Sequence, residues 1–202
     1  MFKDIIREDP FAGFGYAYMI SKWERYYREN YSLKTDFSKV RIPQAGDVQF
    51  PWLICRPENF SAEKALRGGR NLYTKWDWIG NRPLDGLLDM SFGRDGEDKP
   101  YIVLARANWE ADEDLANLSA NMVVERKIYT MCLTERWLLG DFLFWEFGEH
   151  LDEKRITICS GSRYLNGCVP RMFTLDGAVQ EVSIGHSDPN QAHGCLSSRL
   201  VI

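Results

Sequence analysis

The stretch that organises this chain runs from Thr130 to Arg163 and reads TMCLTERWLLGDFLFWEFGEHLDEKRITICSGSR. Its first two thirds place apolar residues at intervals of three and four, the spacing of one helix face. This spacing predicts a helix over residues 131–150, which would be about 30 Å long at about 1.5 Å per residue and would cross a small domain. Residues 156–159 predict a short strand, and Ser160 to Arg163 a loop. We therefore expect a largely buried helix as the central element.

Asp141 interrupts the apolar face of this predicted helix. It stands four residues from both Trp137 and Trp145, so the three side chains are expected to lie in one row. A buried carboxylate without a partner is costly. Two explanations are open: a structural ion pair, for which Arg163 is the expected partner, or a general acid whose pKa is raised by burial. Asp141 is therefore a candidate catalytic residue.

The composition favours a single globular domain spanning residues 1–202. The chain is 45% hydrophobic and 27% charged, which is enough apolar area for one core. Its formal net charge of −4 lacks the basic excess that phosphate binding needs, so we do not expect a nucleic-acid partner. No apolar run is long enough to cross a membrane, and the N-terminus has no export signal. Five cysteines without a Cys-x-x-Cys pair favour a reducing, cytoplasmic location.

The remaining segments alternate between helix and strand patterns. Helical spacing is present over residues 10–30 and 113–129, and strands are predicted over residues 50–55, 72–79, 87–92, 101–107, 172–175, 178–184 and 200–202. Asp176-Gly177 is typical of a tight hairpin turn, and the polar stretch 93–100 predicts a second, longer hairpin. The sequence therefore predicts an α+β fold in which a mostly antiparallel sheet packs against about three helices, including one long buried helix.

The loop from Cys159 to Arg163 is a candidate anion site. Backbone N–H groups of a loop of small residues can bind an anion, and an arginine can add a bidentate contact. Ser160, Ser162 and Arg163 are therefore candidate ligand-binding residues. The spacing is that of neither the Walker loop nor the dinucleotide-binding loop. A plain connection between two strands explains the same residues.

The tail of the chain carries His186, His193 and Cys195 within ten residues. Imidazole and thiolate are good zinc ligands, so these three residues are metal candidates, but their spacing matches no common zinc pattern and we expect no cofactor. The two histidines and Cys159 also offer a base and a nucleophile. They keep open an enzyme, a hydrolase or transferase, with its site around the Cys159–Arg163 loop and the His186–Cys195 tail. A polar turn and a buried apolar cysteine explain the same residues without catalysis.

The stretch from Tyr73 to Trp78 is the strongest candidate binding surface. It reads YTKWDW, with Trp76 and Trp78 on alternate positions, and it closely follows Arg70. Aromatic rings interleaved with Arg and Lys can anchor a protein partner or stack on a small ligand. Large rings also supply core area, so a strand with one buried aromatic face is the alternative. The function expected from this surface is non-enzymatic recognition of a protein or other ligand.

Three short motifs stand in the last third of the chain. They are Thr134-Glu135-x-Trp137 at a helix start, the Cys-Ser-Gly-Ser-Arg turn, and Ser-Arg-Leu-Val from Ser198 to Val201. Their order resembles the closing half of lectin-like and formylglycine-enzyme-like domains, although the Gly-Phe pair that these domains carry before the final arginine is absent. The resemblance implies a lectin-like ligand-binding domain as a further alternative.

Overall fold

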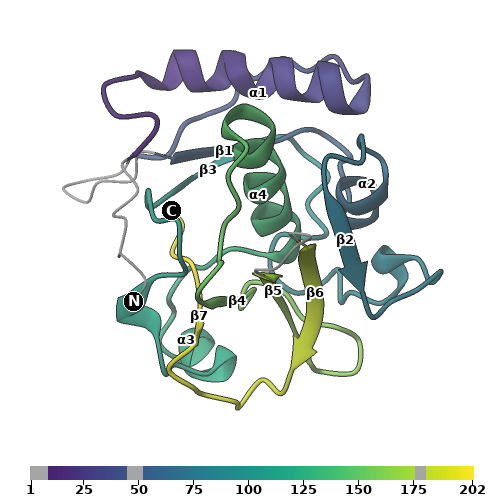
Figure 1. Cartoon of the computed structure of the whole chain (residues 1–202), viewed down its shortest axis with the longest axis vertical. Coiled ribbons are helices and arrows are strands. Elements are labelled where there is room, and N and C mark those ends of the chain that lie inside the picture. Colours follow the sequence, from purple (N-terminus) through teal and green to yellow (C-terminus); the bar gives the residue numbers. More distant parts are fainter. Residues whose placement is uncertain (1–8, 45–51, 176–180) are drawn as a thin grey trace.

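The fold is taken from a computed structural model that describes residues 9–44, 52–175 and 181–202 (Figure 1). The helices of these ranges are α1 (Tyr16–Tyr31), α2 (Ala62–Arg67), α3 (Ala120–Glu125) and α4 (Leu133–Phe147). The strands are β1 (Trp52–Arg56), β2 (Thr74–Asp77), β3 (Tyr101–Ala105), β4 (Ile156–Ile158), β5 (Val169–Leu175), β6 (Glu181–Ser187) and β7 (Leu196–Ser197). The predicted α+β class, with one long buried helix, is confirmed. Within the described residues, no helix combines the length and apolar composition needed to cross a membrane.

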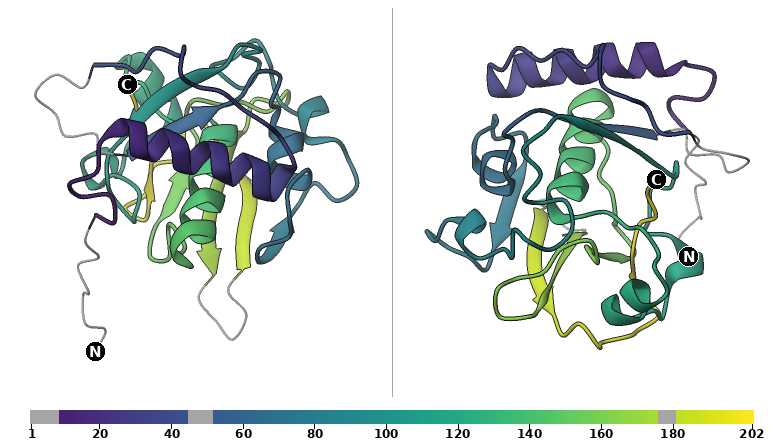
Figure 2. Two further views of the ribbon diagram at one scale, coloured as in Figure 1. Left: turned by 90° about the horizontal axis from the view of Figure 1, so that it is seen from above. Right: turned by 180° about the vertical axis from the view of Figure 1, so that it is seen from behind.

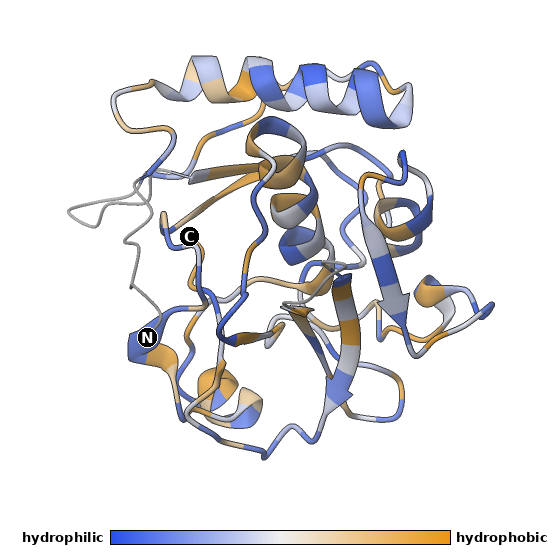
Figure 3. Ribbon diagram, in the orientation of Figure 1, coloured by the Kyte–Doolittle hydropathy of each residue, from blue (hydrophilic) through white to orange (hydrophobic). Residues whose placement is uncertain are grey.

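The strands of the described residues form two separate sheets. The larger one has the order β2-β6-β5-β4-β7, in which β5 pairs antiparallel with β6 and β4, while β2 and β7 pair parallel at the two edges. The smaller one is the antiparallel pair β1-β3. The expected hairpin between residues 87–92 and 101–107 is therefore wrong. Strand β3 is apolar along most of its length (Figure 3) and pairs with β1, which lies far away in sequence, whereas residues 87–92 make a single bridge, from Leu88 to Tyr164.

Helix α4 is the central element, as its sequence predicts. Every residue from Leu133 to Leu143 is buried. The helix begins after Cys132, whose backbone N–H donates to the Glu135 carboxylate at 3.0 Å. It ends at Gly148, which has the left-handed φ of 72° that glycine adopts without strain. This cap makes the helix shorter than the predicted range 131–150.

Helix α1 lies across the β1-β3 pair and α4 (Figures 1 and 2). Its Trp23 is fully buried and stacks on Phe142 of α4, with the ring centroids 4.0 Å apart. The Trp23 indole N–H donates to the Leu53 carbonyl of β1 at 2.7 Å. One side chain thus joins the helix layer to the small sheet, and aromatic pairs of this kind add to the burial energy.

Two predicted helices have different bounds. The first begins at Tyr16 rather than near residue 10, because Gly13 has a left-handed φ of 83° within a turn. The one expected over residues 113–129 is divided into a short 3-10 turn (Glu113–Leu115) and α3. Asn117 adopts a left-handed φ of 62° between them, and the Ser119 side chain caps a new helix. Local capping therefore overrides a continuous helical pattern.

A buried charge cluster fixes α4 to the end of the chain. The Asp152 carboxylate accepts hydrogen bonds from Arg136 of α4 at 2.7 Å and from Arg199 at 2.5 Å, and all three residues are at most 2% exposed. Burial opposes ionisation of Asp152, but the two guanidinium groups outweigh it and hold its pKa below the ordinary value. Arg199 also donates to the carbonyls of Asn108 and Trp109. The cluster therefore joins four segments that are distant in sequence.

Candidate binding site on the five-stranded sheet

The five-stranded sheet has one face against the core and one that carries a groove. Met172 of β5 and Ile184 of β6 are buried in the core. Successive side chains of a strand alternate between the two faces, so Phe173 and Ser183 belong to the opposite face. The register places Trp76 of β2 beside Ser183, and Ser183 beside Phe173. The strands β2, β6 and β5 lie next to one another (Figure 1), so the register places one side chain of each in a row on the outer face.

A groove of about 430 Å³ lies on this outer face, which is within the size range of ligand sites. Its aromatic wall is Trp76, whose side chain is 50% exposed, and Leu175 at the other side is 47% exposed. The full lining consists of Trp76, Arg171, Phe173, Leu175, Glu181, Ser183 and Gly185. We call this set the sheet groove. Large exposed apolar groups beside polar ones are typical of a contact surface.

Arg171 supplies the positive charge of the sheet groove. Its guanidinium lies over Gly185, because a Cβ atom at position 185 would come within 3.0 Å of the Arg171 Nε. That Nε is buried and has no hydrogen-bond partner among the residues the structure describes. A buried donor without a partner is costly, so the described residues do not fully satisfy Arg171.

Charge is separated along the sheet groove. Arg171 pairs with Gly185, whereas Glu181 pairs with Leu175 at the other end of β6. Glu181 and Gly185 stand four positions apart, which corresponds to about 13 Å at about 3.3 Å per residue. The groove therefore has a cation at one end, a carboxylate at the other, and aromatic and aliphatic side chains between them.

The sequence-predicted aromatic surface is only partly assembled. Trp76 is half exposed, so the alternative that it belongs to the core is wrong. Trp78 is half-buried against Tyr164 and His186, with ring centroids 5.5 and 4.7 Å apart, and does not line the groove. Arg70 is exposed but lies beside the end of α1, where its backbone N–H donates to the Asn30 carbonyl at 3.0 Å. The arginine that lines the groove together with Trp76 is Arg171 of β5 instead.

The loop from Cys159 to Arg163 is buried, and its polar groups are engaged within the protein. The Ser160 and Ser198 hydroxyls are 2.7 Å apart, and the Ser162 hydroxyl accepts from the Leu133 N–H at 2.7 Å while donating to Asp95. The Arg163 guanidinium donates to the carbonyls of Ser160 and Ser162. The expected ion pair between Arg163 and Asp141 is therefore wrong. In this structure the loop caps the start of α4.

Asp141 has its own partners in Tyr73, directly before β2, and Lys75 of β2. It accepts a short hydrogen bond from the Tyr73 hydroxyl, and its carboxylate lies 3.9 Å from the Lys75 ammonium. Burial raises the pKa of Asp141, and the nearby Lys75 charge partly offsets this effect. Lys75 is next to Trp76 on β2 and points to the core face. Asp141 therefore holds the strand that carries Trp76 from the side opposite the sheet groove.

The histidine and cysteine candidates do not converge on one centre. Cys159 is fully buried, and burial raises the pKa of its thiol. His186 packs on Trp78, whereas His193 and Cys195 approach each other at 3.1 Å. Among the described residues, no group of three His, Cys, Asp or Glu side chains has the arrangement of a metal site.

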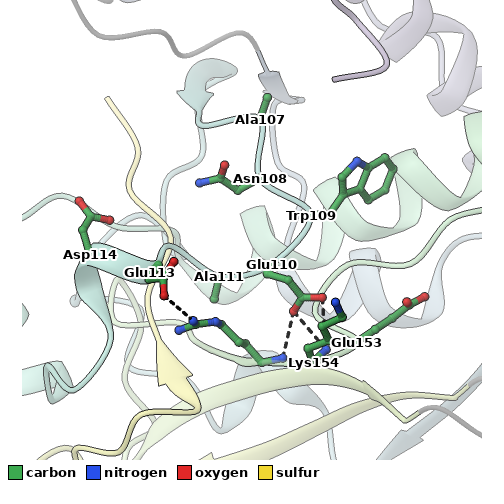
Figure 4. A pocket seen from close by; sticks show the side chains of 10 residues that line it. Ala107, Asn108, Trp109, Glu110, Ala111, Glu113, Asp114, Glu153 and Lys154 are labelled. Carbon is green, nitrogen blue, oxygen red and sulfur yellow. Dashed lines mark hydrogen bonds and ion pairs between the residues drawn. The ribbon is translucent and has the colours of Figure 1, made fainter. Parts of the chain in front are cut away.

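A larger hollow, of about 860 Å³, lies elsewhere (Figure 4). Glu110 accepts backbone N–H bonds from Lys154 and Arg155, and Glu113 pairs with the Arg155 side chain at 3.1 Å. The lining consists of residues 107–111, 113, 114 and 153–155 and includes none of the residues that the sequence singles out. Because these carboxylates are already bonded within the protein, this hollow is the weaker candidate.

Sequence reasoning missed Arg171, Phe173 and Leu175, which complete the sheet groove. The three residues alternate with the buried Pro170, Met172 and Thr174 along β5, but the strand predicted over residues 172–175 starts too late to include Arg171. Alternation alone does not tell which strand will lie beside Trp76. Comparison with known proteins adds no further guide: no protein-family model, curated sequence or solved structure matches the chain.

Proposed function

We propose that this protein is a non-enzymatic binding module whose sheet groove takes a short extended segment of a partner protein. The partner segment would place a carboxylate at Arg171 and an apolar side chain between Trp76 and Phe173. The observation that carries the proposal is the half-exposed Trp76 in a groove whose lining also supplies one guanidinium, that of Arg171.

Trp76 provides the apolar part of the recognition. Tryptophan and arginine are the residue types most enriched where truncation costs the most binding energy. An exposed indole is a rigid contact area that loses little conformational entropy on binding. Phe173 and Leu175 extend the apolar floor, so an aliphatic or aromatic side chain of the partner would leave water on docking.

Arg171 provides the polar part. A guanidinium recognises a carboxylate with two parallel hydrogen bonds, which fixes orientation as well as adding energy. Gly185 lets this side chain lie flat on the sheet, so its donors are held in place before binding. Glu181 at the far end would favour a basic or hydroxyl group of the partner. This separation of charge matches a segment about four residues long in extended form.

A peptide library tests the proposal directly. Random twelve-residue peptides displayed on phage are selected on immobilised wild-type protein after depletion on a Trp76→Ala variant. We expect the enriched peptides to share an acidic residue and an apolar one, and to bind with micromolar affinity. Trp76→Ala and Arg171→Met should each lower the affinity for a selected synthetic peptide by about tenfold or more, as loss of an interface anchor does. Isothermal titration calorimetry measures the effect.

Tyr129→Ala is the matched control, because Tyr129 is a 72% exposed aromatic residue that does not line the sheet groove. Its affinity for the peptide should equal that of the wild type. The proposal fails if no peptide is enriched over the depleted pool, or if the selected peptides bind Trp76→Ala as tightly as wild type. A parallel glycan array covers the lectin-like alternative: sugar binding that requires Trp76, without peptide binding, would replace the protein partner by a carbohydrate.

A further inference from the structure

His193 and Cys195 bring an imidazole and a thiol together in the loop before β7. The Nδ1 atom of His193 lies 3.1 Å from the Sγ atom of Cys195. The backbone N–H of Cys195 also donates to this Nδ1, at 3.3 Å. The nitrogen is therefore an acceptor, and the thiol is the donor in the contact between the two side chains. A nucleophile and a base within hydrogen-bond reach are the structural signature of an activated cysteine.

Backbone hydrogen bonds hold both residues. The Leu196 N–H donates to the His193 carbonyl, and the Ile156 N–H of β4 donates to the Cys195 carbonyl, each at 2.9 Å. The His193 side chain is exposed, and the Cys195 residue is half-buried at the start of β7. The pair is thus kept together by the sheet and is open to reagents from solution.

Each of the other cysteines lacks the exposure of Cys195 or its neighbouring imidazole. Cys55, Cys132 and Cys159 are buried, and burial raises the pKa of each thiol. Cys168 is half-buried, as Cys195 is, but among the described residues it makes no hydrogen bond to an imidazole. Cys168 is therefore an internal control for exposure without a base. Buried thiols are usually inert, whereas exposed thiols beside a basic group react.

We propose that Cys195 is a site of reversible modification by low-molecular-weight disulfides, with His193 as its base. The imidazole accepts the thiol proton, and the resulting thiolate attacks one sulfur of the disulfide. The new bond joins Cys195 to that sulfur while the original S–S bond breaks. The other half leaves as a thiolate and takes the proton from the imidazolium, so no further oxidant is needed. Excess free thiol reverses the modification by the same route.

Reaction of the reduced full-length protein with oxidised glutathione tests this inference. Intact-mass and peptide mass spectrometry follow each cysteine over time at pH 6.5 and pH 9.5. At pH 6.5 we expect Cys195 to react with oxidised glutathione about tenfold faster than Cys168 does. The His193→Gln substitution should lower the reaction rate of Cys195 by about tenfold, because the imidazole is the base that generates the thiolate. At pH 9.5 solvent removes the proton instead, so the effect of His193→Gln should fall below about threefold.

Three outcomes would overturn the inference. The first is an equal reaction rate of Cys195 and Cys168 at pH 6.5, and the second is an unchanged rate of Cys195 in His193→Gln at that pH. The third is a rate of Cys195 that His193→Gln lowers by the same factor at pH 6.5 and pH 9.5. The last outcome would mean that His193 acts only by shaping the loop. Cys195→Ser identifies the modified residue in the wild type. His193 and Cys195 lie outside the sheet groove. Peptide binding in that groove therefore tests the proposed function separately from the reaction of Cys195.

Discussion

Replacing Asp152 with alanine is expected to lower the free energy of unfolding by about 3–5 kcal/mol, as removal of one partner from a buried ion pair does. The reason is that Arg136 and Arg199, each at most 2% exposed, would keep their charges inside the protein without a counter-ion. Urea denaturation followed by circular dichroism at pH 7 measures the change. The matched control is Asp114→Ala, which removes a carboxylate that is 58% exposed and paired with Arg106. An exposed pair contributes less than about 1 kcal/mol.

The effect of Asp152 depends on pH in a defined direction. The folded-state pKa of Asp152 lies below its ordinary value, so the folded protein binds this proton less tightly than the unfolded chain. The stabilisation is therefore complete above about pH 4, where the carboxyl group of the unfolded chain is ionised, and is lost as the pH falls through the folded-state pKa. The difference in unfolding free energy between wild type and Asp152→Ala should therefore narrow as the pH falls below about 4. An equal gap at pH 7 and pH 3 would contradict this account.

Trp23→Ala is expected to cost about 3–5 kcal/mol of unfolding free energy, the range for truncating a large buried ring. The substitution removes the stacking on Phe142 and leaves the Leu53 carbonyl without its indole donor. Phe14→Ala is the control within the same region, because Phe14 is 51% exposed and should cost less than about 1 kcal/mol. Thermal and urea unfolding give both values. Similar losses for the two variants would mean that α1 does not pack as described.

Some parts of the fold follow from local sequence patterns. The spacing in Thr130 to Arg163 identifies α4 as the buried element, and Asp176-Gly177 predicts the antiparallel pairing of β5 and β6, although the turn itself lies outside the described residues. These features are local, since a helix face or a tight turn is specified by neighbouring residues. They could therefore be predicted without knowing the partner segments.

Other parts depend on contacts between distant segments. Strand β3 pairs with β1 instead of residues 87–92, and β2 joins the large sheet by parallel pairing with β6, more than a hundred positions later. Neither choice is visible in alternation, because alternation marks the two faces of a strand and does not identify its partner. The same limit explains the candidate site. Trp76 is noticeable in the sequence, but Arg171, which lies on β5 across β6 from Trp76, joins it in the groove only when β2 is placed beside β6.

Asp141 and the Cys159–Arg163 loop illustrate a second limit. Their residue types are suited to catalysis or anion binding, and burial could be predicted for both. The sequence does not show which donors meet which acceptors. In the structure Tyr73 and Lys75 approach Asp141, and Asp95 and the first turn of α4 engage Ser162. The structure identifies the partners of these polar groups, which their residue types alone do not specify.

The central claim is that the sheet groove recognises a carboxylate through Arg171. A double-mutant cycle tests it most directly: calorimetry measures the affinity of wild type and Arg171→Met for a selected acidic peptide and for the same peptide with its carboxylate replaced by an amide. We predict a coupling energy of about 1.5 kcal/mol or more between Arg171 and the carboxylate, in the range for close charge pairs across an interface. A coupling energy within error of zero would contradict the account.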